Sequence, residues 1–180
     1  MITKSEIEKE IEGKGNFIKI DKLNRFLRQA QSTDVKRFIF LKLAEIYEAS
    51  NMPQESAKMY NHAAISSITF KDKIKYFIKE TEMNVKAGDF QNADDSLKKA
   101  LGESNSSQKE GILSEVKEFY KKQGELYEKE NKRGQAMRIY EHLAGMRLSD
   151  DERFNVREKL LELYDKTGSI RKFKLLKGFD

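Results

Sequence analysis

Apolar residues recur three or four positions apart along most of the chain. Leu41, Ala44 and Tyr47 follow this spacing in one segment, and Ile139 and Leu143 follow it in another. Such spacing places apolar side chains on one face of an α-helix. No segment alternates apolar and polar residues in the way that a half-buried strand does. The pattern therefore predicts an all-α protein.

Short groups of Gly, Ser, Asn and Asp interrupt the helical pattern and divide the chain into ten predicted helices. Two of these helices begin with capping boxes, formed by Thr3 with Glu6 and by Ser149 with Glu152, and Pro53 suits the first position of another. The predicted helices span residues 3–12, 17–31, 34–50, 53–67, 72–87, 89–102, 109–130, 133–146, 150–167 and 169–178.

The predicted helices pair into hairpins that are alike. Four anchor residues mark the hairpins at intervals of 37, 43 and 37 residues: Tyr47, Asn84, Tyr127 and Tyr164. Four positions after the anchors come residue types that tolerate the left-handed conformation at the end of a helix, namely Asn51, Gly88, Asn131 and Gly168. Small residues at other recurring positions would let neighbouring helices approach closely. We expect the repeat to be defined structurally by Phe40, Ala44, Tyr47, Tyr60, Phe77, Gly88, Ala93, Leu97, Tyr120, Gly124, Tyr127, Ala136, Tyr140, Tyr164 and Gly168.

This pattern resembles the tetratricopeptide repeat, a helix–turn–helix unit of 34 residues. The third copy carries the resemblance most fully, and the second copy has the family's second-helix signature in Ala93, Leu97 and Ala100. The resemblance implies an α-solenoid, a right-handed superhelix of about five hairpins whose first helices line a concave groove. An irregular helical bundle is the alternative. As a single domain, 1–180, the chain would comprise a degenerate N-terminal hairpin at 1–33 and repeats at 34–69, 70–105, 109–148 and 149–178.

The step of 43 residues is longer than the other two, and the extra residues fall in the sequence SNSSQKEG. Two interpretations are open for this segment. It forms either an extended loop or a lengthened start of the following helix.

Composition excludes several kinds of chemistry. Charged residues make up 36% of the chain and hydrophobic residues 38%, which favours a stack of small units over one large core. Without Cys there is no disulfide, thiolate nucleophile or Cys-bound zinc. His62 and His142 are too far apart to share a metal ion, and no nucleophile elbow or metalloprotease motif occurs. We expect a protein that is not an enzyme and binds neither cofactor nor metal.

The N-terminal residues carry charges where a secretory signal has an apolar region. No apolar run approaches the roughly 18 residues that cross a bilayer. We therefore expect a cytoplasmic protein with no membrane contact.

Acidic residues occupy two positions of the predicted first helices. Glu45, Glu82, Glu125 and Glu162 lie two positions before the four anchors, and Glu48, Glu128 and Asp165 lie one position after three of them. These two positions are three apart and so are neighbours on one helix face. In register, the hairpins would form an acidic ladder along the groove, which would attract cations. The sequence therefore predicts a protein–protein interaction scaffold that binds a basic, Lys/Arg-containing peptide or helix of a partner.

A simpler interpretation of the same residues is a solvated helix face. Lys86, Lys129 and Lys166 lie four positions after three of the four glutamates and would pair with them within the helix.

Two further interpretations rest on the ends of the chain. Residues 14–42 are rich in Lys and Arg, and so is the segment 171–177, which would suit nucleic-acid phosphates. The aromatic residues of the first stretch, however, have the spacing of a helical core: Phe17, Phe26, Phe38 and Phe40. The apolar residues of the last helix either pack back on the fourth hairpin or offer a surface for homo-oligomers and structural assembly: Phe173, Leu175, Leu176 and Phe179.

Overall fold

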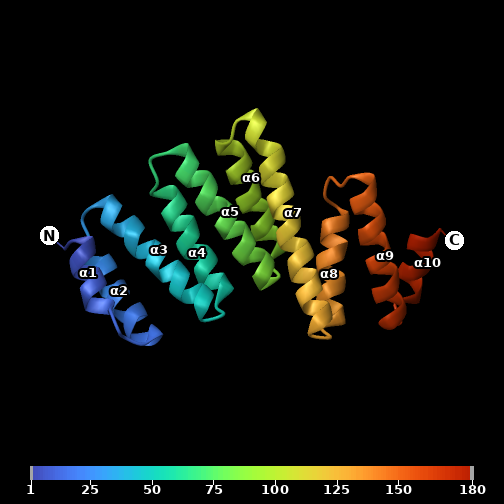
Figure 1. The fold of residues 1–180 in the computed structure, drawn as a ribbon, viewed down its shortest axis with the longest axis horizontal. Helices are drawn as coiled ribbons and strands as arrows, with labels where there is room; N and C mark the ends of the chain where they lie inside the picture. The colour runs from blue at the N-terminus through green and yellow to red at the C-terminus, as the bar shows by residue number, and fades with distance from the viewer. Residues whose placement is uncertain (1, 179–180) are drawn as a thin grey trace. The chain divides into compact units, whose positions relative to one another are not determined.

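The computed structural model describes residues 2–178, and within them the chain forms ten α-helices and no strand (Figure 1). The all-α prediction is confirmed, and each helix begins and ends within about three residues of its predicted place. The helices are α1 (Lys4–Ile11), α2 (Asn16–Gln29), α3 (Thr33–Ala49), α4 (Pro53–Ile65), α5 (Phe70–Ala87), α6 (Phe90–Glu103), α7 (Ser106–Lys129), α8 (Arg133–Ala144), α9 (Asp150–Lys166) and α10 (Ile170–Lys177).

The segment SNSSQKEG lengthens the start of a helix. Helix α7 begins at Ser106 and runs for 24 residues, so most of the segment is helical. Asn105 caps this start, because its Oδ1 accepts the backbone N–H of Gln108 at 3.1 Å. The extended-loop interpretation is therefore wrong.

The chain divides into two compact units, Met1–Ile112 (unit 1) and Leu113–Asp180 (unit 2). In unit 1, α2 packs on α1 and α3, α4 packs on α3 and α5, and α5 also packs on α6. In unit 2, α9 packs on α8 and α10. Within each unit, helices that follow one another in the chain therefore lie side by side, as stacked hairpins require.

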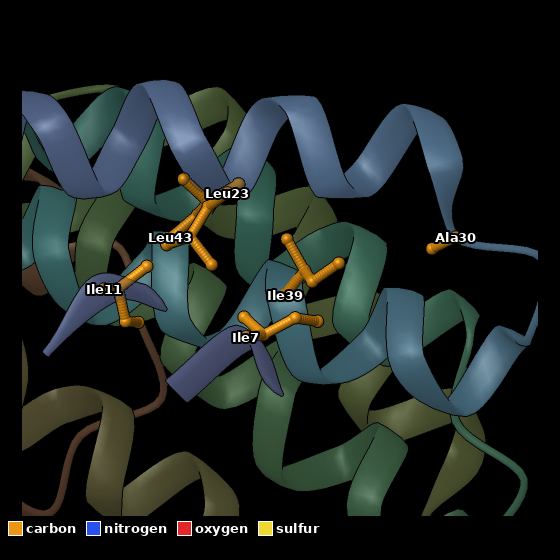
Figure 2. Close-up of a cluster of buried hydrophobic side chains, with 6 residues drawn as sticks. All are labelled: Ile7, Ile11, Leu23, Ala30, Ile39 and Leu43. Atoms are coloured by element: carbon orange, nitrogen blue, oxygen red, sulfur yellow. The ribbon is translucent and has the colours of Figure 1, made fainter. Parts of the chain in front are cut away.

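The first three helices enclose an apolar cluster at the start of unit 1. Figure 2 shows Leu23 of α2 pointing toward Ile39 and Leu43 of α3, with Ile7 and Ile11 of α1 nearby. All five side chains are at most 8% exposed. At about 25 cal/mol per Å² of buried apolar area, such a cluster fixes the N-terminal hairpin on α3.

The turns after the anchors have the conformation that the sequence predicts. Asn51, Gly88, Asn131 and Gly168 all have positive φ, between 56° and 71°. In each turn, the backbone N–H that follows this residue donates to the carbonyl of the anchor, at 2.8–3.0 Å. The four hairpins thus bend in the same way at the same place, which fixes the register of the side chains beyond each turn.

One aromatic residue departs from its prediction. Phe26 and Phe38 pack against the first apolar cluster, as core spacing predicts. Phe17 is 90% exposed; it lies in the first turn of α2 and is not among the residues that pack against this cluster. Helical spacing identified the correct helix but not which of its aromatic residues would be buried.

Candidate interaction surface

The first and third repeats make the same contacts in units 1 and 2. In unit 1 the Phe40 ring stacks on His62 with ring centroids 4.9 Å apart. In unit 2 Tyr120 stacks on His142 at 5.0 Å. These rings stand seven positions before and fifteen after the anchors Tyr47 and Tyr127. Each histidine ring therefore packs on an aromatic ring of the first helix, and this contact recurs in both repeats.

A small residue in the first helix faces a buried tyrosine in the second helix of both repeats. Ala44 and Tyr60 share a buried cluster in unit 1. In unit 2 the corresponding residues are Gly124 and Tyr140, and a Cβ on Gly124 would lie only 2.7 Å from Cζ of Tyr140. The close approach of the two helices places each tyrosine hydroxyl near the carboxylates at the end of the first helix.

In unit 1, three of the predicted groove carboxylates influence the pKa of Tyr60, and one of them contacts its hydroxyl. The Tyr60 hydroxyl donates to Oε2 of Glu48 at 3.3 Å. Lys86 from α5 pairs with Glu48 at 3.0 Å and with Glu82 at 2.9 Å. Burial raises the pKa of Tyr60, and the charges of Glu48, Glu45 and Glu82 raise it further. The carboxylates of the α3 and α5 helices therefore act on one hydroxyl.

Glu82 stays ionised although it is partly buried. Burial alone would raise its pKa, but hydrogen bonds from Lys79 and Lys86 outweigh burial and hold the pKa below its ordinary value. Burial likewise opposes the charge of Lys86, whose pKa is nevertheless raised by Glu82 and Glu48. This part of the surface is a mixed-charge network and not a row of free acids.

Unit 2 repeats the arrangement around Tyr140. Burial raises the pKa of Tyr140, and the charges of Glu128, Glu125 and Glu162 raise it further. Lys159 from α9 pairs with Glu128 at 2.7 Å, and Lys166 pairs with Glu162. A cavity of about 880 Å³ opens beside these residues, and its lining includes Glu125, Tyr140, Glu162, Asp165 and Phe173.

The carboxylates differ in whether they are already paired. No ion pair within residues 2–178 involves Glu45, Glu125 or Asp165, and all three side chains are exposed. Pairing within the helix, the simpler interpretation, occurs between Glu82 and Lys86 and between Glu162 and Lys166. The third predicted pair, Glu125 with Lys129, does not form. Helix-surface pairing thus accounts for half of the four glutamates.

The sequence contains a row of lysines that the acidic pattern alone overlooks. Lysine lies five positions before every anchor, and one of these lysines, Lys159, reaches back to Glu128 of the preceding repeat. The recurrence of lysine at this position could have been found in the sequence, at Lys42, Lys79, Lys122 and Lys159.

Ion pairs occupy much of the basic N-terminal stretch. Lys22 pairs with Glu10, Arg25 with Asp21, Arg37 with Asp34 and Lys42 with Glu8. These cations are less available to phosphates than the sequence suggests. Among the described residues, no group of three His, Asp or Glu side chains has the geometry of a metal site.

The C-terminal helix α10 packs on α9, and it leaves Ile170 and Leu175 more than 60% exposed. Phe173 turns inward and lines the unit 2 cavity. Phe179 lies outside the described residues. Self-association through this helix stays a prediction.

Comparison with protein families identifies the relatives of the chain. The family model described as "Soluble NSF attachment protein, SNAP" matches residues 27–171, which is most of the chain. The chain belongs to the SNAP family. No curated protein and no solved structure matches it. This SNAP-family chain is a helical-repeat protein, as predicted from the hairpins, although the match does not name the tetratricopeptide family itself.

Membership also bears on the class of function. A SNAP-family helical-repeat domain is a protein-interaction scaffold, which agrees with the function predicted from the repeats. Within residues 2–178, every helix is too short or too polar to cross a bilayer.

Proposed function

We propose that each unit binds a basic, Lys/Arg-containing segment of a partner protein through its own carboxylates, those around Tyr60 in unit 1 and those around Tyr140 in unit 2. The observation that carries this proposal is the recurrence of one arrangement in two separate units. In unit 1 Lys86 of α5 pairs with Glu48 of α3, and in unit 2 Lys159 of α9 pairs with Glu128 of α7. Each pair lies beside a buried tyrosine whose pKa is raised by burial and by the charges of the nearby carboxylates. The family is named for an attachment protein, and attachment requires a surface that binds another protein.

Glu45, Glu125 and Asp165 are the carboxylates that a partner would contact first. They are exposed and take no part in an ion pair of the described chain, so a basic ligand need not displace a resident lysine to reach them. Each exposed pair contributes roughly 0.2–1 kcal/mol, so loss of the one acid in unit 1 should weaken binding there by about threefold, and loss of the two acids in unit 2 should weaken binding there by about tenfold. Salt screens such contacts over about 10 Å at 0.1 M, so binding should weaken as ionic strength rises.

The test replaces these three acids by their neutral isosteres, Glu45→Gln, Glu125→Gln and Asp165→Asn. A fluorescent Lys/Arg-rich peptide is titrated with the full chain, and anisotropy gives the dissociation constant. We expect the triple variant to bind the peptide about three- to tenfold more weakly than the wild type, with unchanged helical content by circular dichroism.

A matched control carries the same change in net charge at exposed acids away from Tyr60 and Tyr140, namely Glu12→Gln, Glu110→Gln and Glu115→Gln. We expect the control to bind within about twofold of the wild type. Equal losses in both triple variants would show a nonspecific effect of net charge, and no loss in either would refute the proposal.

A further inference from the structure

A polar cavity of about 550 Å³ lies in unit 1, lined by residues of α4, α5 and α6 and of the turn between α5 and α6. On α5 its lining residues are Glu80 and Asn84, which are four positions apart and share one side of the helix. Glu82 lies two positions from each and therefore on a different side. The cavity is thus separate from the carboxylates around Tyr60.

Asn84 is buried in this cavity without a partner. The residue is 6% exposed, and no hydrogen bond within residues 2–178 involves its carboxamide. Neither of its amide atoms is among the fully enclosed, unsatisfied side-chain atoms of the described chain, so the carboxamide opens into the cavity, where water or a ligand can reach it. A ligand that fills the cavity would satisfy both the donor and the acceptor of this side chain.

Both acids of the cavity already have partners. Glu80 is 7% exposed, and the Asn61 carboxamide donates to both of its oxygens at 2.9 Å. Lys99 lies 3.4 Å from the same carboxylate. Asp89 caps α6 and accepts the backbone N–H and the side-chain N–H of Asn92 at 3.2 and 2.7 Å.

In unit 2, larger side chains stand at the positions equivalent to the three asparagines of the cavity. The residues 80 positions after Asn61, Asn84 and Asn92 are Glu141, Tyr164 and Lys172. The Tyr164 hydroxyl donates to Oε1 of Glu141 at 2.9 Å, and Lys172 donates to the same oxygen at 2.7 Å. In unit 2, three charged or aromatic side chains therefore bond to one another at the positions where unit 1 has three carboxamides.

Two further differences between equivalent residues of the two units enlarge the cavity in unit 1 or make it more polar. Ala57 lines the cavity where unit 2 has Met137, whose sulfur lies 4.0 Å from the hydroxyls of Thr167 and Ser169. Glu80 stands where unit 2 has the buried Leu160. Unit 1 therefore has smaller or more polar side chains than unit 2 at these positions.

We propose that this cavity binds the backbone of an uncharged, extended peptide segment through the carboxamides of Asn61, Asn84 and Asn92. A carboxamide presents one acceptor and two donors in a plane, which matches the N–H and C=O of a peptide group. The charges of the lining cancel, because Glu80 and Asp89 are balanced by Lys58 and Lys99. Neither a cationic nor an anionic ligand is favoured, and the volume lies within the range of sites for small ligands.

The test uses the full chain, labelled with ¹⁵N, and the capped peptide acetyl-Gly-Gly-Gly-N-methylamide, which carries peptide groups and no charge. We expect saturable shifts of the side-chain NH₂ signals of Asn61, Asn84 and Asn92 in heteronuclear NMR spectra. Arginine amide and N-acetylglutamate serve as the cationic and anionic comparisons, and we expect neither to give saturable shifts.

Two variants separate binding from folding. Asn84→Ala removes the unpartnered carboxamide and keeps the cavity, and we expect it to lose the saturable shifts of Asn61 and Asn92. The quadruple change Asn61→Glu, Glu80→Leu, Asn84→Tyr and Asn92→Lys copies the side chains that fill this position in unit 2, and we expect it to abolish the saturable shifts caused by the capped peptide and to raise the melting temperature.

Three results would overturn the proposal. They are no saturable shift with the capped peptide, an equal response in Asn84→Ala, and saturable binding of arginine amide or N-acetylglutamate alone. Because the peptide is uncharged and the variants leave the acids near Tyr60 intact, none of these results bears on the proposed basic partner.

Discussion

Glu152 connects two parts of unit 2 through a single carboxylate. It accepts the backbone N–H of Ser149 in a capping box at the start of α9. It also pairs with Lys117 and Lys121 of α7, at 2.7 and 3.3 Å. The hydrogen bond from Lys117, followed by the one from Ser149, lowers the pKa of Glu152 to about 2. The sequence predicted the cap. It did not predict the two ion pairs, because they join residues 31 and 35 positions apart and no local sequence pattern indicates them.

The stability of unit 2 should therefore depend on the ionisation of Glu152. The folded pKa lies below the ordinary value of 4.5, so the contribution is complete above about pH 4.5 and is lost as the pH falls toward 2. We expect Glu152→Gln to lower the free energy of unfolding by about 1–2 kcal/mol at pH 7 and by less at pH 3. Urea denaturation at both pH values measures the difference.

Glu158→Gln is the control, because Glu158 is an exposed acid on the same helix and takes part in no ion pair of the described residues. Its effect should be small at both pH values. A Glu152→Gln deficit as large at pH 3 as at pH 7 would show that the carboxylate charge is not responsible.

At the scale of the helix pair, the contact between α7 and α8 depends on the missing side chain at Gly124. An added Cβ would lie 2.7 Å from Cζ of Tyr140, which is 3% exposed and enclosed by its neighbours. We expect Gly124→Ala to destabilise unit 2 by roughly 1–3 kcal/mol, as overpacking does. Thermal unfolding followed by circular dichroism measures the loss.

Gly134 in α8 provides the matched control, since nothing lies within 4 Å of the Cβ that Gly134→Ala would add. That substitution should stabilise the helix by up to about 1 kcal/mol. Adding Tyr140→Leu to Gly124→Ala should recover part of the loss, because the second repeat has Leu97 at this place. Equal effects of Gly124→Ala and Gly134→Ala would contradict the close approach of the two helices.

The helices themselves could be predicted well from the sequence. Apolar spacing, capping boxes and turn residues such as Asn51 and Gly88 are local signals, and local contacts decide where these helices begin and end. Exposure at the edges of helices was less predictable. Phe17 has core spacing, but it lies at the first turn of α2 and does not pack against the apolar cluster of the first three helices.

At the scale of the whole molecule, the net charge of +5 concealed the organisation of charge on the surface. The repeat register predicted which glutamates would share a face, and in each unit they do act on one tyrosine. Which glutamates remain free could not be predicted, because Lys86 and Lys159 come from the next repeat. The polar cavity of unit 1 also needed the structure, since Asn61 lies 23 and 31 positions before Asn84 and Asn92.

Reversing the charge of the unpaired acids tests the central claim most directly. The full chain carrying Glu45→Lys, Glu125→Lys and Asp165→Lys is compared with the wild type for binding a Lys/Arg-rich and a Glu-rich peptide. We predict that the variant loses at least about tenfold in affinity for the basic peptide and gains affinity for the acidic one, both effects fading with salt. An unchanged affinity for the basic peptide, in a variant with wild-type helical content, would contradict the account.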